Sequence, residues 1–307
     1  MRDLAALLLV AAQIQSVHPV IHTLKYICTA SSQIPNFPEF LAVGYVDGVQ
    51  IDHYDSKSRK LRPTQDWMNK ITAEDPHYWE RETLISIAQE QVSKVDIEIA
   101  KESFNQTGGV HMFQRSYGCE WDDETDEVDG WEQHAYDGED FISFDLKGLR
   151  YIAVKPQAVV TKNKWDQFDL QHRKHYITEI CPSYLKKYVS FGRDFLMRTV
   201  LPRISLLQKT SRSPVTCHAT GFYPREAALF WRKDGEELFE DVEMGDTLPN
   251  HDGTFQTTAD LKAVDAYGKY ECVFQLAGVP EDVVTPLDPA NVLSNERIRG
   301  RQIIDGL

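Results

Sequence analysis

Two groups of side chains in this 307-residue chain have types that could bind a metal ion or act on a substrate. The first is an acidic run between Glu120 and Asp129, with seven carboxylates in ten residues, which could form a calcium loop. The run lacks the mid-loop glycine and closing glutamate of an EF-hand, so it is interpreted as a solvated hairpin. The second group, His172 and His175, has no carboxylate at ligand spacing. Because GxSxG, HExxH and P-loop motifs are also missing from the sequence, we expect a protein that is not an enzyme.

Five cysteines could form disulfides or bind a metal. No CxxC or CxH spacing occurs, so a metal site is not expected. The wide, similar gaps of 62 and 55 residues predict two bridges, Cys119–Cys181 and Cys217–Cys272, and leave Cys28 unpaired. In the chain-entropy model each bridge stabilises its unit by roughly 4 kcal/mol.

The amino terminus and the net charge indicate a compartment and exclude one class of partner. Residues 1–16 contain an apolar stretch, Leu4–Ala12, that has the length of a signal-peptide core and is too short to span a bilayer. No other segment resembles a membrane span, and residues 289–307 form a polar tail. We therefore expect a secretory-pathway protein on the extracellular side, secreted if the sequence is complete. The formal net charge of −14 excludes nucleic acid as an expected partner.

Two successive units share one order of elements. In the first, alternating segments predict strands at Leu24–Thr29, Phe40–Val46 and Val49–Tyr54, and Asp47-Gly48 predicts a hairpin turn. A helical pattern follows from about residue 75 to 104, with apolar residues at Leu84, Ile87, Ala88, Val92, Val95, Ile99 and Ala100. In the second, strands are predicted at Val110–Tyr117, Trp131–Tyr136 and Phe141–Leu146, then a helix from Gln157 to about Met197 with a break near Pro182. The predicted fold class is α+β, an antiparallel sheet platform carrying two long helices.

A third unit, from about Pro202 to Leu287, has short strands only. It contains the run Cys217-His-Ala-Thr-Gly-Phe-Tyr-Pro224, Trp231 fourteen residues after that cysteine, and Tyr270 two residues before Cys272. This spacing is typical of the disulfide, buried tryptophan and tyrosine corner of an immunoglobulin domain. The unit is therefore predicted to be an all-β immunoglobulin C1-type sandwich.

Two platform units with a disulfide only in the second, followed by this sandwich, resemble the MHC class I heavy chain over about residues 20–287. The motifs that carry the resemblance are Tyr78-Trp79, Phe104-Asn-Gln-Thr-Gly-Gly109, Tyr117-Gly-Cys119, Tyr136-Asp-Gly-Glu-Asp-Phe141 and Thr161-Lys-Asn-Lys-Trp165. The segments GCEWDDET and YDGEDFISFDL resemble the versions found in ray-finned fish. The resemblance implies an alpha-1 domain at 17–109, an alpha-2 domain at 110–201 and an alpha-3 domain at 202–288.

The family's function implies that the two helices enclose a groove for short peptides, presented to the T-cell receptor. At the end that binds the peptide amino terminus, the matching residues are Tyr26, Tyr78, Glu82, Tyr117, Tyr176 and Tyr188. Tyr184 belongs to the same end and stands where the family usually has a tryptophan, which keeps an aromatic wall. At the carboxylate end they are Phe141, Thr161, Lys164 and Trp165. Hydroxyl and N–H groups suit this task because they bind the backbone and charged termini that all peptides share. No cofactor is implied.

A second departure from the family pattern, at Ser103, keeps an alternative open. Ser103 stands where relatives have a tyrosine or arginine that contacts the peptide carboxylate. Loss of that group weakens capture of a carboxylate. The alternative function is therefore a non-peptide or soluble class I-like molecule, such as a lipid binder, a transport receptor or a decoy.

Strand periodicity places three further residues on the groove floor. Cys28 is either a buried apolar thiol or a group that captures a ligand covalently. Arg115 and His134 either favour acidic ligand groups or pair within the floor.

The resemblance also implies contacts outside the groove. The expected light chain is β2-microglobulin, met by Gln114, Gln133 and Asp140 beneath the sheet. Asn105 begins the only N-x-S/T sequon and is the expected glycosylation site. The loop Glu236–Glu243 matches the coreceptor-docking loop of relatives, but Leu238 and Phe239 make it unusually apolar, so coreceptor binding is not predicted.

Overall fold

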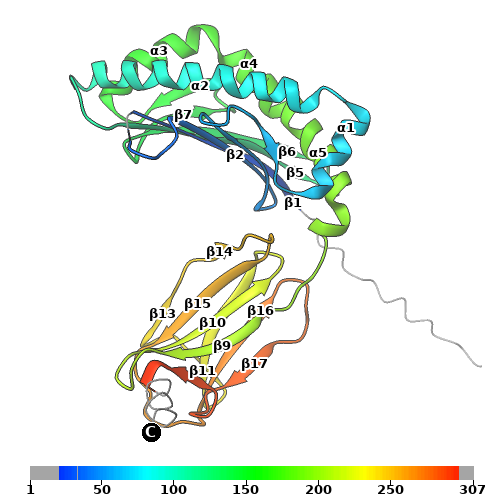
Figure 1. Cartoon of the computed structure of the whole chain (residues 1–307), viewed down its shortest axis with the longest axis vertical. Coiled ribbons are helices and arrows are strands. Elements are labelled where there is room, and N and C mark those ends of the chain that lie inside the picture. Colours follow the sequence, from blue (N-terminus) through cyan, green and yellow to red (C-terminus); the bar gives the residue numbers. More distant parts are fainter. Residues whose placement is uncertain (1–20, 33, 297–307) are drawn as a thin grey trace, which may run out of the picture.

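The structure is a computed structural model that describes residues 21–32 and 34–296. A sheet platform covered by helices lies above a β-sandwich (Figure 1). The signal peptide expected at 1–16 lies outside the described residues, as do residues 297–307 of the tail expected at 289–307. The described part of that tail is not without structure, because Val292–Ser294 forms a strand of the sandwich. Among the described residues, no helix combines the length and apolar character needed to cross a membrane.

The platform is one eight-stranded antiparallel sheet in the order β4-β3-β2-β1-β5-β6-β7-β8. Its strands are β1 (Ile21–Ser31), β2 (Phe40–Val46), β3 (Val49–Asp55), β4 (Arg62–Pro63), β5 (Met112–Asp122), β6 (Val128–Tyr136), β7 (Glu139–Asp145) and β8 (Arg150–Ala153). The six predicted strands are confirmed, and β2 shows the alternation of a half-buried strand along its whole length. The two strands at the sheet edges, β4 and β8, are too short to show that pattern.

The two units join along β1 and β5, where eleven residue pairs run from Ile21 opposite Asp122 to Ser31 opposite Met112. Gly118 allows this pairing, since a Cβ built there would lie 2.0 Å from the Leu24 carbonyl oxygen. The next residue, Cys119, forms the predicted disulfide with Cys181 and so ties the sheet to the second helical segment.

The first long helix is confirmed with a shorter range than predicted. A 3₁₀ turn, η1 (Asp66–Lys70), and a short helix, α1 (Ile71–Glu74), precede α2 (Tyr78–Ser103). Three of the apolar side chains that give this segment its periodicity, Leu84, Val92 and Val95, are more than half exposed. The buried side of α2 instead includes Glu90, which accepts a hydrogen bond from Tyr54 Oη at 2.8 Å.

The second helical segment differs from the prediction of one helix broken near Pro182. It consists of η2 (Pro156–Ala158), α3 (Val159–Phe168), α4 (Leu170–His175), a π turn η3 (Tyr176–Ile180) and α5 (Cys181–Leu196). Pro182 lies in the first turn of α5, where a backbone N–H has no partner in the helix and its absence costs nothing. The interruptions therefore fall before Pro182, at Asp169 and in the π turn.

The acidic run forms the β5–β6 hairpin, as the sequence predicted. The Asp122 carboxylate accepts the backbone N–H groups of Glu124 and Thr125, each at 2.9 Å. Asp126 accepts a hydrogen bond from Trp121 Nε1 at 2.8 Å and pairs with Lys186 on α5. Within residues 21–32 and 34–296, no cluster of His, Cys, Asp and Glu has an arrangement that could hold a metal ion.

The third unit is a sandwich of two sheets, in the orders β13-β15-β10-β9-β18 and β12-β11-β16-β17. Its strands are β9 (Arg203–Gln208), β10 (Val215–Phe222), β11 (Ala227–Lys233), β12 (Glu236–Leu238), β13 (Val242–Met244), β14 (Leu248–Pro249), β15 (Phe255–Leu261), β16 (Tyr270–Leu276), β17 (Val283–Pro286) and β18 (Val292–Ser294). The short strand β14 pairs with β15.

The core of the sandwich matches the immunoglobulin prediction. The disulfide Cys217–Cys272 joins β10 to β16. Trp231 is fully buried, and its Nε1 donates to the Ala259 carbonyl at 3.0 Å. Tyr270 Oη donates to Asp265 Oδ1 at 2.7 Å, which fixes the corner before the second cysteine.

Candidate functional site

Two neighbouring cavities lie between the helices and the sheet. The tyrosine cavity, of about 420 Å³, is lined by the six tyrosines Tyr26, Tyr78, Tyr117, Tyr176, Tyr184 and Tyr188, and also by Asp52 and Glu82. The arginine cavity, of about 450 Å³, is lined by residues that include Cys28, Asp96, Arg115, Glu132, His134, Trp165 and Arg173. Both cavities are lined by Gln89, Arg115 and Arg173, so they meet at one wall.

The six tyrosines of the tyrosine cavity contact one another across the groove. Tyr78 on α2 and Tyr188 on α5 are hydrogen-bonded through their hydroxyl groups. Tyr26 on β1 stacks on Tyr117 of β5, with ring centroids 5.4 Å apart, and Tyr117 meets the edge of Tyr176 at 5.6 Å. Burial raises the pKa of Tyr26, Tyr176 and Tyr188 well above the ordinary value, so these hydroxyls stay neutral donors and acceptors at physiological pH.

A charged rim closes the tyrosine cavity at the start of α2. Arg81 contacts Asp75 at 2.6 Å, Glu82 at 3.2 Å and the Tyr184 hydroxyl at 3.4 Å. Burial raises the pKa of Glu82, and the neighbouring Arg81 guanidinium opposes that rise. Arg81 is therefore occupied by protein groups rather than free for a ligand.

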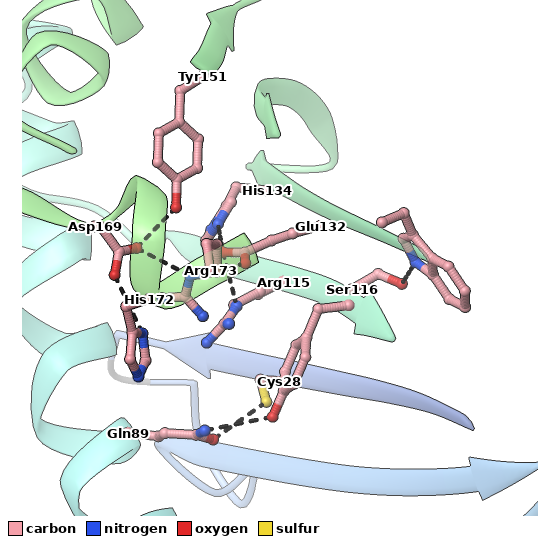
Figure 2. Close-up of polar contacts among 12 residues, drawn as sticks. Cys28, Gln89, Arg115, Ser116, Glu132, His134, Tyr151, Asp169, His172 and Arg173 are labelled. Atoms are coloured by element: carbon pink, nitrogen blue, oxygen red, sulfur yellow. Dashed lines mark hydrogen bonds and ion pairs between the residues drawn. The ribbon is translucent and has the colours of Figure 1, made fainter. Parts of the chain in front are cut away.

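The centre of the groove floor is a buried ion cluster around Glu132. Figure 2 shows the side chains of Arg115, from β5, and Arg173, from α4, converging on this carboxylate. Arg115 Nε lies 3.1 Å from Glu132 Oε1, and Arg173 Nε lies 3.0 Å from Oε2. Arg173 Nε also contacts Asp169 at 2.9 Å. Burial alone would raise the pKa of Glu132, but Arg115, His134 and Arg173 together hold it well below its ordinary range.

His134 joins this cluster as a neutral ring. Its Nε2 lies 2.7 Å from Glu132 Oε1, and a hydrogen bond to a carboxylate requires the proton on that nitrogen. Burial lowers the pKa of His134 against the opposing effect of Glu132. Of the two possibilities left open for Arg115 and His134, the structure shows pairing within the floor.

Cys28 lies on the floor between the two guanidinium groups and α2. Its thiol is buried and faces Gln89 Oε1 at 3.8 Å. Burial raises the pKa of the thiol to about 11, so it is protonated at neutral pH and is a poor nucleophile. This geometry favours the interpretation as a small apolar group over covalent capture of a ligand.

Comparison with known proteins agrees with the platform, the groove and the sandwich. The family model described as "Class I Histocompatibility antigen, domains alpha 1 and 2" matches residues 20–196, and that described as "Immunoglobulin C1-set domain" matches residues 199–278. The chain belongs to the MHC class I family.

Three class I relatives illustrate how much of the chain the similarity covers. The class I histocompatibility antigen F10 alpha chain of Gallus gallus is 37% identical over 92% of this chain and 82% of its own length. The major histocompatibility complex class I-related protein 1 of Mus musculus is 34% identical over 97% and 88%. The H-2 class I K-K alpha chain of Mus musculus is 36% identical over 87% and 74%.

The residues that class I membership implies for carboxylate capture are more dispersed than the tyrosines. Trp165 lines the arginine cavity and packs 4.7 Å from His134. Phe141 is fully buried within an aromatic cluster, and its ring centroid lies 6.2 Å from that of Phe104. Thr161 is buried with an unpartnered hydroxyl, and Lys164 is exposed. Neither cavity is lined by these last three residues.

Ser103 is the last residue of α2, and its hydroxyl is turned back onto its own helix. Its Oγ donates to the Ile99 carbonyl at 2.9 Å. The side chain therefore offers neither a cation nor a free donor for a ligand carboxylate.

The residues for which the resemblance implies contacts outside the groove lie on the surface or near it. Gln133 and Asp140 are exposed and hydrogen-bonded at 2.8 Å, whereas Gln114 is half-buried on β5. Asn105 is exposed immediately after α2, where an attached glycan would meet solvent. In the loop between β12 and β13, Phe239 is 79% exposed.

Three carboxylates that line the two cavities were not predicted from the sequence: Glu132, Asp96 and Asp52. Glu132 lies two residues before His134 on the same face of β6, so the alternation that placed His134 on the floor could have placed Glu132 there too. Asp96 lines the arginine cavity, and burial raises its pKa to about 6 while Arg115 opposes that rise. Asp52 lies beside the buried Ile51 and interrupts the alternation of β3.

Proposed function

We propose that the chain is a class I heavy chain that binds short peptides between α2 and the α3–α5 segment and presents them to T cells. The observation that carries the proposal is the tyrosine cavity, which presents neutral hydroxyl groups from both helical walls and from the sheet. Such groups bind a peptide amino terminus and backbone without reading side chains. The 26-residue α2 spans about 39 Å, which is long enough for roughly nine extended residues.

We infer that β2-microglobulin is the light chain and lies against the underside of the platform. A hollow of about 480 Å³ separates β1 and β2 from the sandwich, lined by residues that include Lys25, Ile27, Tyr45, Tyr223 and Arg225. A partner that fills this hollow would join the two units, which supports the light-chain proposal. Class I membership further supports a location on the extracellular side and a function without catalysis.

The test is to refold the chain with β2-microglobulin and to identify acid-eluted ligands by mass spectrometry. We expect a stable heterodimer that yields peptides of about nine residues. A stable heterodimer that yields lipids, or no peptide, contradicts the proposal.

A second candidate function is binding of a non-peptide ligand. The position of Ser103 and the packed aromatic cluster around Phe141 favour it, because the two cavities lie toward the tyrosines and the centre. A ligand smaller than a peptide would fill both cavities without any need for carboxylate capture.

Substitution of Ser103 distinguishes the two candidates. Ser103→Arg adds a cation at the end of α2, and a charge-assisted bond contributes about 1.5–3 kcal/mol, so peptide affinity is expected to rise roughly tenfold or more. The measurement is competition binding of nonapeptides with a free or an amidated carboxyl terminus.

Ser103→Ala is the matched control, because it removes the hydroxyl without adding charge, and it should leave affinity unchanged. An equal gain for amidated peptides, or no gain with Ser103→Arg, contradicts carboxylate capture at this position.

A further inference from the structure

A carboxylate lies at the base of the tyrosine cavity. Asp52 on β3 is 2% exposed and lines the cavity together with Tyr26 and Tyr78. It pairs across the sheet with Gly44 on β2. A Cβ built at Gly44 would lie 2.7 Å from both Asp52 Oδ1 and Tyr26 Cε1, so the glycine makes the room that this carboxylate occupies.

This carboxylate lacks a protein counter-ion at its inner oxygen. Asp52 Oδ2 is buried and has no hydrogen-bond partner among the described residues. The guanidinium groups on the cavity wall are committed elsewhere: Arg81 contacts Asp75, and Arg115 and Arg173 contact Glu132. Burial of an unpaired carboxylate is costly, and a cation in the cavity would remove that cost.

We propose that the tyrosine cavity binds its ligand through a cationic group, an ammonium or a guanidinium, placed against Asp52. This inference rests on the proposed function and specifies the ligand chemistry of that site. The cation comes either from the terminal amine of a peptide or from a lysine or arginine side chain near it. The hydroxyls of Tyr26, Tyr78 and Tyr188 accept its remaining protons, and Glu82 adds a second negative charge on the same cavity.

The same geometry gives ligand binding a pH dependence. Burial raises the pKa of Asp52 to about 7, opposed by a hydrogen bond from the Gly44 backbone N–H and reinforced by Glu82. A bound cation favours the ionised carboxylate, so binding of a lysine or arginine side chain releases a proton and strengthens as pH rises from about 6 to 8. A terminal amine has a pKa of about 7.7–8.0 and begins to lose its own proton at the upper end of that range, so for this source the gain flattens above about pH 7. The other groups facing Asp52 are Tyr26, Tyr78 and Tyr188, which stay neutral; Glu82, Arg81, Arg115, His172 and Arg173 line the same cavity.

The experiment measures affinities of four nonapeptides for the refolded complex at pH 6 and pH 8. The peptides carry lysine or norleucine at position two, each with a free or an acetylated amino terminus. We expect the peptide with neither cation to bind about ten- to a hundredfold more weakly than one with its cation in place. A loss on acetylation identifies the terminal amine as the source, and a loss on replacing lysine identifies the side chain.

Asp52→Asn is expected to remove both the cation preference and the pH dependence. Its melting temperature without ligand should not fall, since the variant replaces an unpaired buried charge by a neutral group of the same shape. Asp55→Asn is the control on the same strand, outside the cavity, and should behave as the wild type. An unchanged cation preference in Asp52→Asn overturns the inference.

If no peptide binds the wild-type complex, the proposed function fails and a second probe tests the cavity. n-Pentylamine should then raise the melting temperature of the wild type, whereas n-pentanol should not. n-Pentylamine should also leave the melting temperature of Asp52→Asn unchanged. Equal effects of amine and alcohol on the wild type overturn the inference.

Discussion

Replacing Glu132 by alanine is expected to destabilise the groove platform by about 3–5 kcal/mol. The carboxylate is 1% exposed and is shared by Arg115 and Arg173, so its removal leaves two guanidinium groups in the floor without their common counter-ion. Glu132→Gln keeps the shape but not the charge and should lose most of the same stability. Urea unfolding followed by tryptophan fluorescence measures the change.

Glu127→Ala is the matched control, because this glutamate is exposed in the hairpin that precedes β6 and should change stability by no more than about 0.5 kcal/mol.

Glu132→Gln also tests how the stability of the platform depends on acid pH. The pKa of Glu132 is lower in the folded chain than in the unfolded one, so its stabilisation is complete above about pH 4.3 and is lost as pH falls further. A Glu132→Gln variant as stable as the wild type at pH 7 contradicts this account.

Removal of the sandwich disulfide by Cys217→Ala with Cys272→Ala is expected to destabilise that unit by roughly 4 kcal/mol. The bridge closes a loop with a sequence separation of 55 residues, and that constraint on the unfolded chain is lost. For a unit of this size the melting temperature should fall by about 15 °C or more. Differential scanning calorimetry under non-reducing conditions measures the shift.

The corresponding control is Cys28→Ala, which removes the thiol that is outside both disulfides and should cost roughly 1 kcal/mol. If the variant with both Cys217→Ala and Cys272→Ala had the same melting temperature as the wild type, packing around Trp231 alone would be enough to maintain this unit.

The sequence was sufficient for features that depend on local pattern. The strands followed from alternation and from the Asp47-Gly48 turn, and the disulfides followed from cysteine spacing within units. The breaks in the second helical segment could not be predicted, because Phe168–Leu170 contains neither glycine nor proline and Pro182 is tolerated in the first turn of α5.

The candidate site was predictable where aromatic residues line it and not where carboxylates do. Asp and Glu are usually exposed, so a single sequence gives no reason to bury Asp52, and for Glu132 it offers only the strand face shared with His134. Their positions depend on cross-strand neighbours: β3 pairs Asp52 with Gly44, and β6 places Glu132 opposite Tyr117. Those pairings become visible only when the register of the sheet is known.

The unbalanced buried charge of the groove floor lies in one of the two cavities only. In the arginine cavity, Arg115 and Arg173 are already balanced by Glu132, and Asp96 and Asp169 line the same cavity. Asp52 in the tyrosine cavity has an oxygen without a partner among the described residues. A ligand with a cation at its leading end is therefore favoured in one of the two possible directions along the groove, before any contact at its far end.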